Sequence, residues 1–199
     1  MNKVLLQTLI SKSLNMWGKR IPGKELLGFS RAAFDEVSKL FEQITFTDVF
    51  GKERHKLNVT ELDQVIYEDD KITLMTLYFE EGRTYPIHDH PEMVVFSKAL
   101  LGSLQIEHWD RMEKKLLISN PSSEEKFQAV RKETKIVTEK DIAIITPNTN
   151  NFHRITAKKE AVLLDLVFNN YDTERPFNTY EIIEEGRNYD VLKRLPQDN

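Results

Sequence analysis

The sequence predicts a mainly β protein, an antiparallel barrel or double-sheet jelly roll with a helical extension at its N-terminus. Three observations predict this class. Apolar residues recur at helical spacing up to about residue 60. After residue 70 the chain changes to short apolar runs of the strand type. Turn-forming residues separate these runs, and no long helical pattern lies between them, which favours antiparallel sheets.

Two helices are expected in the extension. The first carries Val4, Leu5, Ile10 and Leu14 at helical spacing. The second begins after Ser30, a residue type suited to capping a helix N-terminus, and its apolar positions are 34, 37, 40, 41 and 44. Residues 1–24 contain basic residues and no acid, as in a transit peptide. Arginine is scarce there, so an amphipathic helix is the preferred interpretation.

Nine strand-like runs follow the extension, and turn signals at 80–86, 119–125 and 146–151 separate some of them. The runs are 71–79, 93–101, 103–109, 115–119, 127–132, 134–139, 141–146, 161–168 and 179–183. We therefore expect residues 1–60 to form a helical extension packed on a barrel of residues 61–199, in one structural domain overall.

Composition excludes several classes of protein. The 199 residues contain 28 Lys and Arg against 32 Asp and Glu, a net charge of −4 that argues against a general nucleic-acid binder. Cysteine is absent, which excludes disulfides and cysteine-ligated metal sites. No apolar run approaches the ~20 residues that span a bilayer. We expect a cytoplasmic monomer with neither nucleic-acid nor membrane partners; a nuclear location and a transit peptide stay open.

The segment "YPIHDHPEMVVF" places two of the five histidines, His88 and His90, one residue apart in a strand-like setting. On a strand, residues i and i+2 face the same side, so the two imidazoles would project together and Asp89 would point away. Aligned imidazoles can share one metal cation. The alternative is a chance pair of surface histidines. His55 is expected in a solvated loop. His108 lies outside this motif and faces either the core or a neighbouring strand.

The spacing of these residues resembles the first motif of the cupin jelly rolls, in which Gly82, His88, His90 and Gly102 fall in register. The second cupin motif ends in a lone histidine after a proline-containing turn. "DIAIITPNTNNFHRITA" resembles it, with His153 one residue later than usual.

The glutamate that common cupins use as a fourth ligand falls at Val94 or Val95. The resemblance therefore implies a metal site of three neutral histidines. From coordination chemistry alone, zinc and iron both remain open.

A closer resemblance covers roughly residues 30–183. The blocks "YPIHDHPEMVVFSKALLGSLQIEHWD", "FHRITA" and "AVLLDLVFNNY" resemble the thiol dioxygenase family of plant cysteine oxidases and cysteamine (2-aminoethanethiol) dioxygenase. This family implies Fe(II) held by His88, His90 and His153. Nickel or zinc could replace iron in a crystal, because imidazole suits all three metals. It implies addition of both atoms of O2 to a thiol, which gives a sulfinic acid. The implied substrates are cysteamine or an N-terminal cysteine, whose oxidation marks a protein for degradation when oxygen is plentiful.

Two further residues carry over from the family. Asp165 and Tyr171 match its active-site aspartate and tyrosine. A carboxylate inside an apolar strand is costly unless something pairs with it, so Asp165 is expected to meet a substrate ammonium or to form a structural salt bridge. Glu92 stands where the family usually has glycine. The absence of cysteine excludes the Cys–Tyr crosslink of some thiol dioxygenases.

Three functions compete at this point. The first is an iron thiol dioxygenase that acts on N-terminal cysteine of peptides, or on cysteamine. The second is an isomerase or hydrolase on the same scaffold that uses zinc or manganese. The third is a non-catalytic cupin that binds a small ligand. The complete histidine set favours the first over the third, and the valines at 94 and 95 favour it over the second.

Overall fold

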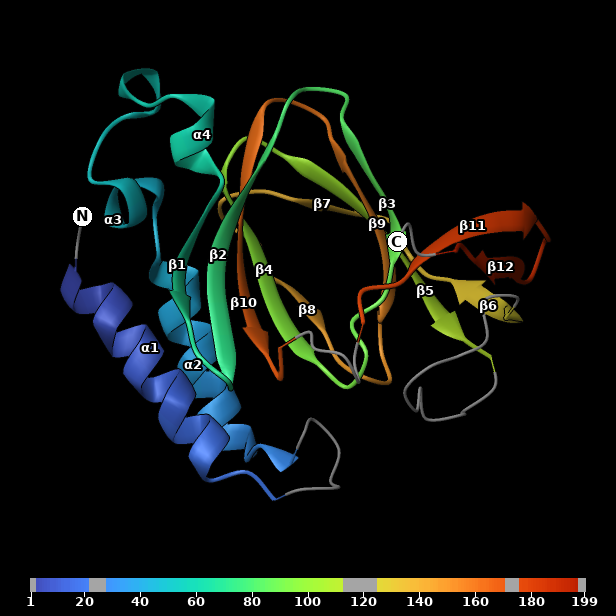
Figure 1. The fold of residues 1–199 in the computed structure, drawn as a ribbon, viewed down its shortest axis with the longest axis horizontal. Helices are drawn as coiled ribbons and strands as arrows, with labels where there is room; N and C mark the ends of the chain where they lie inside the picture. Colours follow the sequence, from blue (N-terminus) through green and yellow to red (C-terminus); the bar gives the residue numbers. More distant parts are fainter. Residues whose placement is uncertain (1–2, 22–27, 113–124, 171–175, 197–199) are drawn as a thin grey trace.

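Two antiparallel sheets face each other in a barrel, and the N-terminal helices pack on the outside of one of them (Figure 1). The computed structural model describes residues 3–21, 28–112, 125–170 and 176–196. This arrangement confirms the predicted fold class, a mainly β cupin-type jelly roll with a helical extension. None of the helices in these ranges is long and apolar enough to cross a membrane.

The first sheet has five strands in the order β1-β2-β10-β4-β8. Their bounds are Gln64–Glu68, Ile72–Phe79, Ala161–Phe168, Val94–Leu101 and Ala143–Ile145. The second sheet has seven strands in the order β6-β12-β11-β3-β9-β5-β7. Their bounds are Lys126–Arg131, Asp190–Arg194, Thr179–Glu184, Thr84–His88, Phe152–Ala157, Leu104–Arg111 and Lys135–Val137.

The strand predictions differ from the structure at four strands. Strand β3 begins at Thr84, inside the predicted turn 80–86, because Thr84 and Tyr85 pair with β9. Strands β1, β9 and β12 had no counterpart among the predicted runs. The predicted run 115–119 and most of the turn 119–125 lie outside the described residues.

The helices are α1 (Lys3–Gly18), α2 (Arg31–Gln43), α3 (Phe46–Phe50), a 3-10 turn η2 (Arg54–Lys56) and α4 (Val59–Leu62). Ser30 caps α2, since its hydroxyl accepts a hydrogen bond from the N–H of Ala33 at 3.3 Å. Three of the four apolar residues predicted for α1, Leu5, Ile10 and Leu14, are partly buried against the core. The fourth, Val4, is 72% exposed, and Leu6 and Leu9 are buried instead.

One hydrophobic cluster joins the helices to the outer face of the five-stranded sheet. The rings of Phe34 and Phe41 on α2 lie 4.9 and 6.0 Å from the ring of Phe96 on β4. Because side chains alternate along a strand, even-numbered residues of β4 and β10 meet the helices and odd-numbered ones point into the barrel. A second cluster fills that interior with residues of both sheets, such as Leu163 and Ile106.

The tripeptide Phe96-Ser97-Lys98 shows this alternation. Phe96 packs on the helices and Ser97 points into the barrel. Lys98 turns back to the helices, where its Nζ donates to the carbonyls of Glu42 at 2.6 Å and Ile44 at 3.0 Å. These carbonyls end α2, so the buried ammonium completes its C-terminus, where a positive charge is favourable.

Replacing Lys98 by methionine keeps the apolar stem and removes the ammonium. Two carbonyls then lose their donor, and we expect the free energy of unfolding to fall by about 2 kcal/mol. Chemical denaturation measures the change. The control is Lys52→Met, which breaks an exposed ion pair with Glu61 and should change stability by less than about 0.5 kcal/mol. Equal stability of the Lys98 variant and the wild type would refute this role.

Candidate metal centre

Three buried histidines meet inside the barrel. His88 ends β3, His90 lies in the connection to β4, and His153 is on β9. One ring nitrogen from each lies within 4.8 Å of the others. The ring centroids of His88 and His153 are 4.1 Å apart, and those of His90 and His153 are 5.0 Å apart. The structure thus brings together the three histidines that the sequence singled out, in a group that could hold a metal ion.

The prediction that His88 and His90 share one strand was wrong. Strand β3 ends at His88, and the chain turns directly after His90, at Pro91 and Glu92. Glu92 has a left-handed backbone with φ 54°, a conformation that glycine adopts at least cost. This explains why the family usually has glycine there. The Glu92 side chain is exposed.

The side chain of Asn151 makes the backbone hydrogen bonds to His90 that a neighbouring strand would otherwise make. Its Oδ1 accepts the backbone N–H of His90 at 2.8 Å, and its Nδ2 donates to the backbone carbonyl of His90 at 3.2 Å. A second hydrogen bond from Nδ2 reaches the carbonyl of Pro147 at 3.2 Å. Asn151 therefore ties two of the histidine-bearing segments together. Sequence analysis missed it, because an asparagine in a turn usually only shapes the turn.

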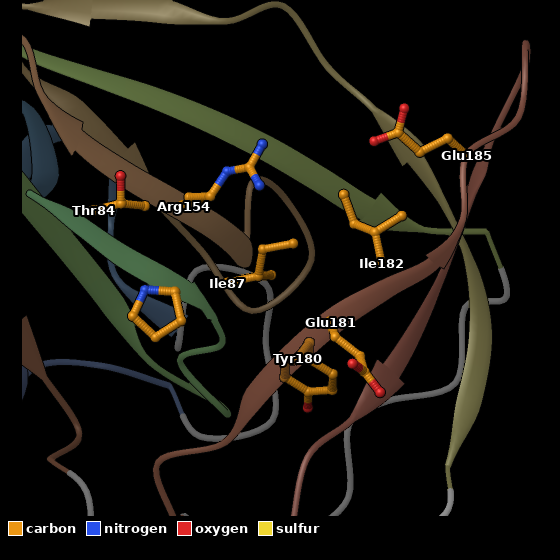
Figure 2. Close-up of a pocket in the computed structure, with 8 residues that line it drawn as sticks. Thr84, Ile87, Arg154, Tyr180, Glu181, Ile182 and Glu185 are labelled. Atoms are coloured by element: carbon orange, nitrogen blue, oxygen red, sulfur yellow. The ribbon is translucent and has the colours of Figure 1, made fainter. Parts of the chain in front are cut away.

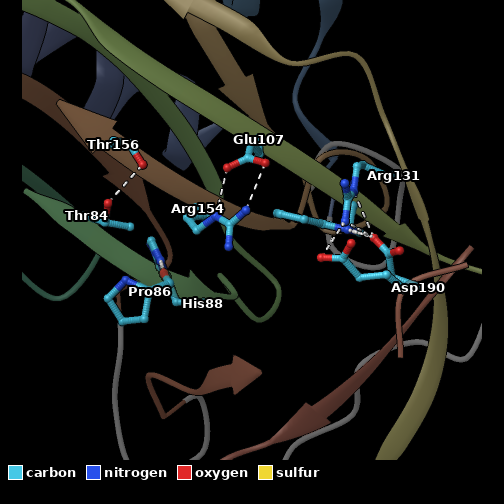
Figure 3. A network of polar contacts seen from close by, with 10 residues as sticks. Thr84, Pro86, His88, Glu107, Arg131, Arg154, Thr156 and Asp190 are labelled. Carbon is cyan, nitrogen blue, oxygen red and sulfur yellow. Dashed lines mark hydrogen bonds and ion pairs between the residues drawn. The ribbon is translucent and has the colours of Figure 1, made fainter. Parts of the chain in front are cut away.

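Backbone carbonyls orient two of the imidazoles. Nδ1 of His88 lies 2.9 Å from the carbonyl oxygen of Pro86 (Figure 3), and Nδ1 of His153 lies 3.4 Å from that of Asn151. A carbonyl only accepts, so Nδ1 carries the proton in each hydrogen bond and Nε2 keeps its lone pair. Metal-bound histidines usually show this arrangement.

Burial keeps the cluster neutral. It lowers the pKa of His88 to about 4, against the smaller opposing effect of the Pro86 carbonyl. Burial and then the neighbouring histidines hold the pKa values of His90 and His153 well below their ordinary value. Three neutral imidazoles at physiological pH are ready to bind a cation without first losing protons. The donor set therefore fits a divalent transition metal.

His108 is a fourth buried histidine beside this cluster. It pairs in register with His153 on the adjacent strand, and their ring centroids are 6.0 Å apart. Its ring nitrogens have no hydrogen-bond partner of normal geometry among the described residues, although the Asn150 backbone opposes the lowering of its pKa by burial. Its alternation with Leu104 and Ile106 was the sequence signal for an inward position.

Asp165 lies at the centre of β10, in register with Ser97 on β4 and Met75 on β2. It follows the interior residue Leu163 by two positions, so it points into the barrel. Its partner Ser97 lies midway along β4, the strand that begins four residues after His90.

The Asp165 carboxyl group is buried without an ion pair among the described residues, so the alternative of a structural salt bridge finds no support there. Its Oδ1 has no hydrogen-bond partner in the described ranges. Burial raises the pKa of Asp165 to about 7, and a hydrogen bond from Ser97 opposes this shift. Tyr171, the other expected catalytic residue, lies outside the described residues.

Apolar side chains occupy the position of the absent glutamate. Val95 points inward and packs with Met93, Ile145 and Val167 in one buried cluster. Val94 faces the helices. Neither valine position therefore offers a carboxylate ligand, and the apolar residues around Val95 are buried.

Asp89 points away from the three histidines, as its place between His88 and His90 predicted. It is 1% exposed. The hydroxyl of Tyr180 donates to its Oδ2 at 2.8 Å, and Nδ2 of Asn178 donates to its Oδ1 at 3.1 Å. Burial raises the pKa of Asp89 to about 6, and these hydrogen bonds oppose the shift.

An open groove of about 500 Å³ runs along the outer side of β3 (Figure 2). It forms because β11 pairs with β3 at only two positions and then diverges. Its lining residues are Thr84, Pro86, Ile87, Arg154, Tyr180, Glu181, Ile182 and Glu185. Arg154 is held by a two-pronged ion pair with Glu107 at 2.8 and 2.9 Å (Figure 3). The groove lies on the opposite face of β3 from the histidine cluster.

The fold and the cluster define a cupin-type barrel with a three-histidine group able to hold a metal ion. A probable 2-aminoethanethiol dioxygenase of Dictyostelium discoideum is 35% identical over 112 residues, 54% of this chain and 49% of that protein. Plant cysteine oxidase 2 of Arabidopsis thaliana is 27% identical over 153 residues, 74% of this chain and 53% of that protein. An RmlC-like cupin structure from Shewanella frigidimarina shares 14% identity, with a TM-score of 0.40 over 55% of this chain and 76% of that chain.

The chain belongs to the PCO_ADO family, whose model matches residues 31–187. This is the family of plant cysteine oxidases and 2-aminoethanethiol dioxygenases that the sequence resembles. The chain spans about half the length of the curated relatives it matches.

Replacing Asp165 by asparagine should change how stability depends on pH. The folded metal-free protein holds the Asp165 proton up to about pH 7, whereas the unfolded chain releases it near the ordinary value of 3.8. Stability from the protonated form is therefore complete below that value and is lost as the pH rises to about 7. Between pH 5 and 7 the wild type should lose about 1.4 kcal/mol per pH unit relative to Asp165→Asn. Parallel curves from denaturation of the metal-free proteins would contradict the raised pKa.

Removing any one histidine of the cluster should remove the metal. We expect His88→Ala, His90→Ala and His153→Ala each to lose metal while the fold survives, because two ligands hold a cation far more weakly than three. Metal analysis of the purified proteins, with circular dichroism for the fold, gives the answer. The exposed His55 provides the control, and His55→Ala should keep its metal. A cluster variant with full metal content would exclude that histidine from the site.

Proposed function

We propose that the protein is an iron-dependent thiol dioxygenase that adds both atoms of O2 to a thiol and forms a sulfinic acid. The observation that carries this proposal is the cluster of three buried, neutral histidines in a chain that belongs to this family. Val95 packs at the glutamate position, so the site would have three neutral ligands and keep the full charge of the cation.

The residues divide the work by position. His88 and His153 would hold Fe(II) through their Nε2 atoms, since backbone carbonyls engage their Nδ1 atoms, and His90 would supply the third ring nitrogen. The iron would supply open positions at which the thiolate and O2 meet, and the thiol sulfur would give up the four electrons that O2 accepts as both oxygen atoms pass to it. The buried apolar cluster around Val95 would limit the entry of water into the part of the interior that it lines. A dry site of this kind protects a reactive intermediate from side reactions.

Asp165 is the proposed partner of the substrate's ammonium group. Its Oδ1 has no partner in the described part of the chain, and Ser97 orients the carboxyl group. An ammonium would favour the ionised form and lower the raised pKa of Asp165. An aminothiol, which carries its thiol and ammonium on adjacent carbons, would then fit between this carboxylate and the histidines. Tyr171 is proposed as a second active-site residue from the family resemblance alone.

The second candidate function is a zinc or manganese isomerase or hydrolase. Such an enzyme needs a general base near the metal. His108 favours this candidate, since it is buried beside His153 and its ring nitrogens have no partner of normal geometry among the described residues. Family membership favours the dioxygenase.

For the substrate we favour N-terminal cysteine of peptides over cysteamine. The "FSK" block is nearer to that of the plant-type enzymes, and plant cysteine oxidase 2 aligns over 74% of the chain. Cysteamine is the alternative, because the Dictyostelium relative is named for that substrate. A cytoplasmic location and a monomeric state remain predictions from the sequence.

An assay under labelled O2 tests the reaction and the substrate together. We expect the iron-loaded protein to oxidise a peptide with N-terminal cysteine, and mass spectrometry to find two oxygen atoms from one O2 on the cysteine. Free cysteine, cysteamine and a peptide with N-terminal serine are run beside it. Oxidation of cysteamine alone would overturn the choice of substrate. Oxidation of no thiol by the iron-loaded protein would overturn the dioxygenase itself.

A further inference from the structure

Asp89 connects the histidine segment to the C-terminal hairpin, the pair of strands β11 and β12. Its carboxylate accepts hydrogen bonds from the side chains of Asn178 at 3.1 Å and Tyr180 at 2.8 Å. Its backbone N–H donates to the carbonyl of Asn178 at 3.3 Å. Asn178 directly precedes β11 and Tyr180 lies on it. The residue between two candidate metal ligands is thus held from both its side chain and its backbone.

The hairpin itself is firmly attached to the barrel. Asp190 at the start of β12 accepts hydrogen bonds from Nε1 of Trp109 at 2.7 Å and Nε of Arg131 at 2.9 Å (Figure 3). A separate hydrophobic cluster lies beneath it, made of Ile87, Trp109, Phe127, Ala129, Phe152, Tyr180 and Leu192. The hairpin that binds Asp89 is therefore itself fixed to the barrel by hydrogen bonds and apolar packing.

On the side of the C-terminal hairpin, strand pairing gives β3 little support, although β9 pairs with its other side. Only two residues of β3 pair with β11, His88 with Thr179 and Ile87 with Tyr180. Beyond them the strands diverge and the groove of Figure 2 opens. The chain leaves β3 at His88, so the Asp89 hydrogen bonds continue the attachment to the hairpin past the end of the strand.

We propose that Asp89 is a positioning residue through which the C-terminal hairpin sets the affinity of the three-histidine site for a divalent metal. This inference rests on the proposed metal site. Asp89 fixes the backbone between His88 and His90, so both rings are already placed before the metal binds. Ligands that are held in advance lose less conformational freedom on binding, and their supporting hydrogen bonds commonly change metal affinity by about 10- to 100-fold.

The test compares two variants that break the same contact from opposite sides. Asp89→Asn keeps the shape and one acceptor oxygen, and Tyr180→Phe removes a single hydroxyl. The matched control is Tyr78→Phe, because the Tyr78 hydroxyl bonds Glu160 at 2.9 Å, away from the cluster. The dissociation constants for Co(II) and Zn(II) are measured by competition with a coloured chelator. The visible spectrum of bound Co(II) reports the ligand geometry, and chemical denaturation reports stability.

We expect Asp89→Asn to weaken binding of both metals by about 10- to 100-fold and Tyr180→Phe by about 10-fold. Both should alter the Co(II) spectrum, and Tyr78→Phe should leave affinity and spectrum unchanged. The double variant should bind about as weakly as Asp89→Asn alone, because the two changes remove one shared contact.

A purely structural role would lower the stability of Asp89→Asn and Tyr180→Phe and leave metal affinity and the Co(II) spectrum unchanged, and this result would overturn the inference. Tyr180→Phe decides the question if Asp89→Asn fails to fold. Fully additive losses in the double variant would also overturn the shared contact. If the folded wild type binds neither metal, the proposed metal centre fails, and that failure is distinct from a metal-binding wild type with unaffected variants.

Discussion

Strands β4 and β10 are buried on both faces, and this constraint decides what each of their residues can do. The helices cover one face and the barrel interior lies on the other. Side chains along these strands therefore alternate between the helix-facing cluster and the interior. A polar residue on either face needs a specific partner, because burial without one is costly. Lys98 has the carbonyls that end α2. Ser97 and Asp165 face the interior, where Ser97 donates a hydrogen bond to the Asp165 carboxyl group.

The same burial sets the electrostatics of the interior. It disfavours every charged form, so it lowers the pKa of the histidines and raises that of Asp165. The result is an uncharged polar end in an apolar barrel. A cation bound by the histidines would reverse the preference of Asp165, because an ionised carboxylate is favourable near a positive charge. Metal binding would then favour release of the Asp165 proton.

The histidines were predictable because their spacing, with a glycine on either side, can be recognised in the sequence without knowledge of any long-range contact. The glycines have a physical reason in the structure. Gly102 has φ 74°, and a Cβ there would lie 1.9 Å from the carbonyl oxygen of Glu160. Asp165 was singled out by the family resemblance, and an acid inside an apolar run agreed with a buried position. The fold class followed from the change of period near residue 60.

Other features could not be predicted, because they depend on contacts between distant parts of the chain. Asn151 bonds His90 across 61 positions, and Tyr180 bonds Asp89 across 91. Asn151 resembles any turn asparagine in the sequence, and Tyr180 resembles any strand tyrosine. The prediction for α1 was wrong at Val4 and missed Leu6 and Leu9 for a related reason. Its apolar residues surround much of the helix, and packing against α2 and the sheet selects which of them are covered.

Because the amide of Asn151 is bonded to the backbone of His90, the position of His153 does not depend on the shape of the turn before Asn151. Residues 146–150 close on themselves through a bridge between Thr146 and Thr149, and Asn150 turns the chain with φ 58°. Directly after this turn, Asn151 forms hydrogen bonds with the backbone of His90 and fixes the position of the chain relative to that segment. His153 stands one residue later than in the usual cupin spacing, and this turn can absorb the extra residue. Loop length could therefore drift among relatives of this protein while the distance between the two histidine segments stays constant.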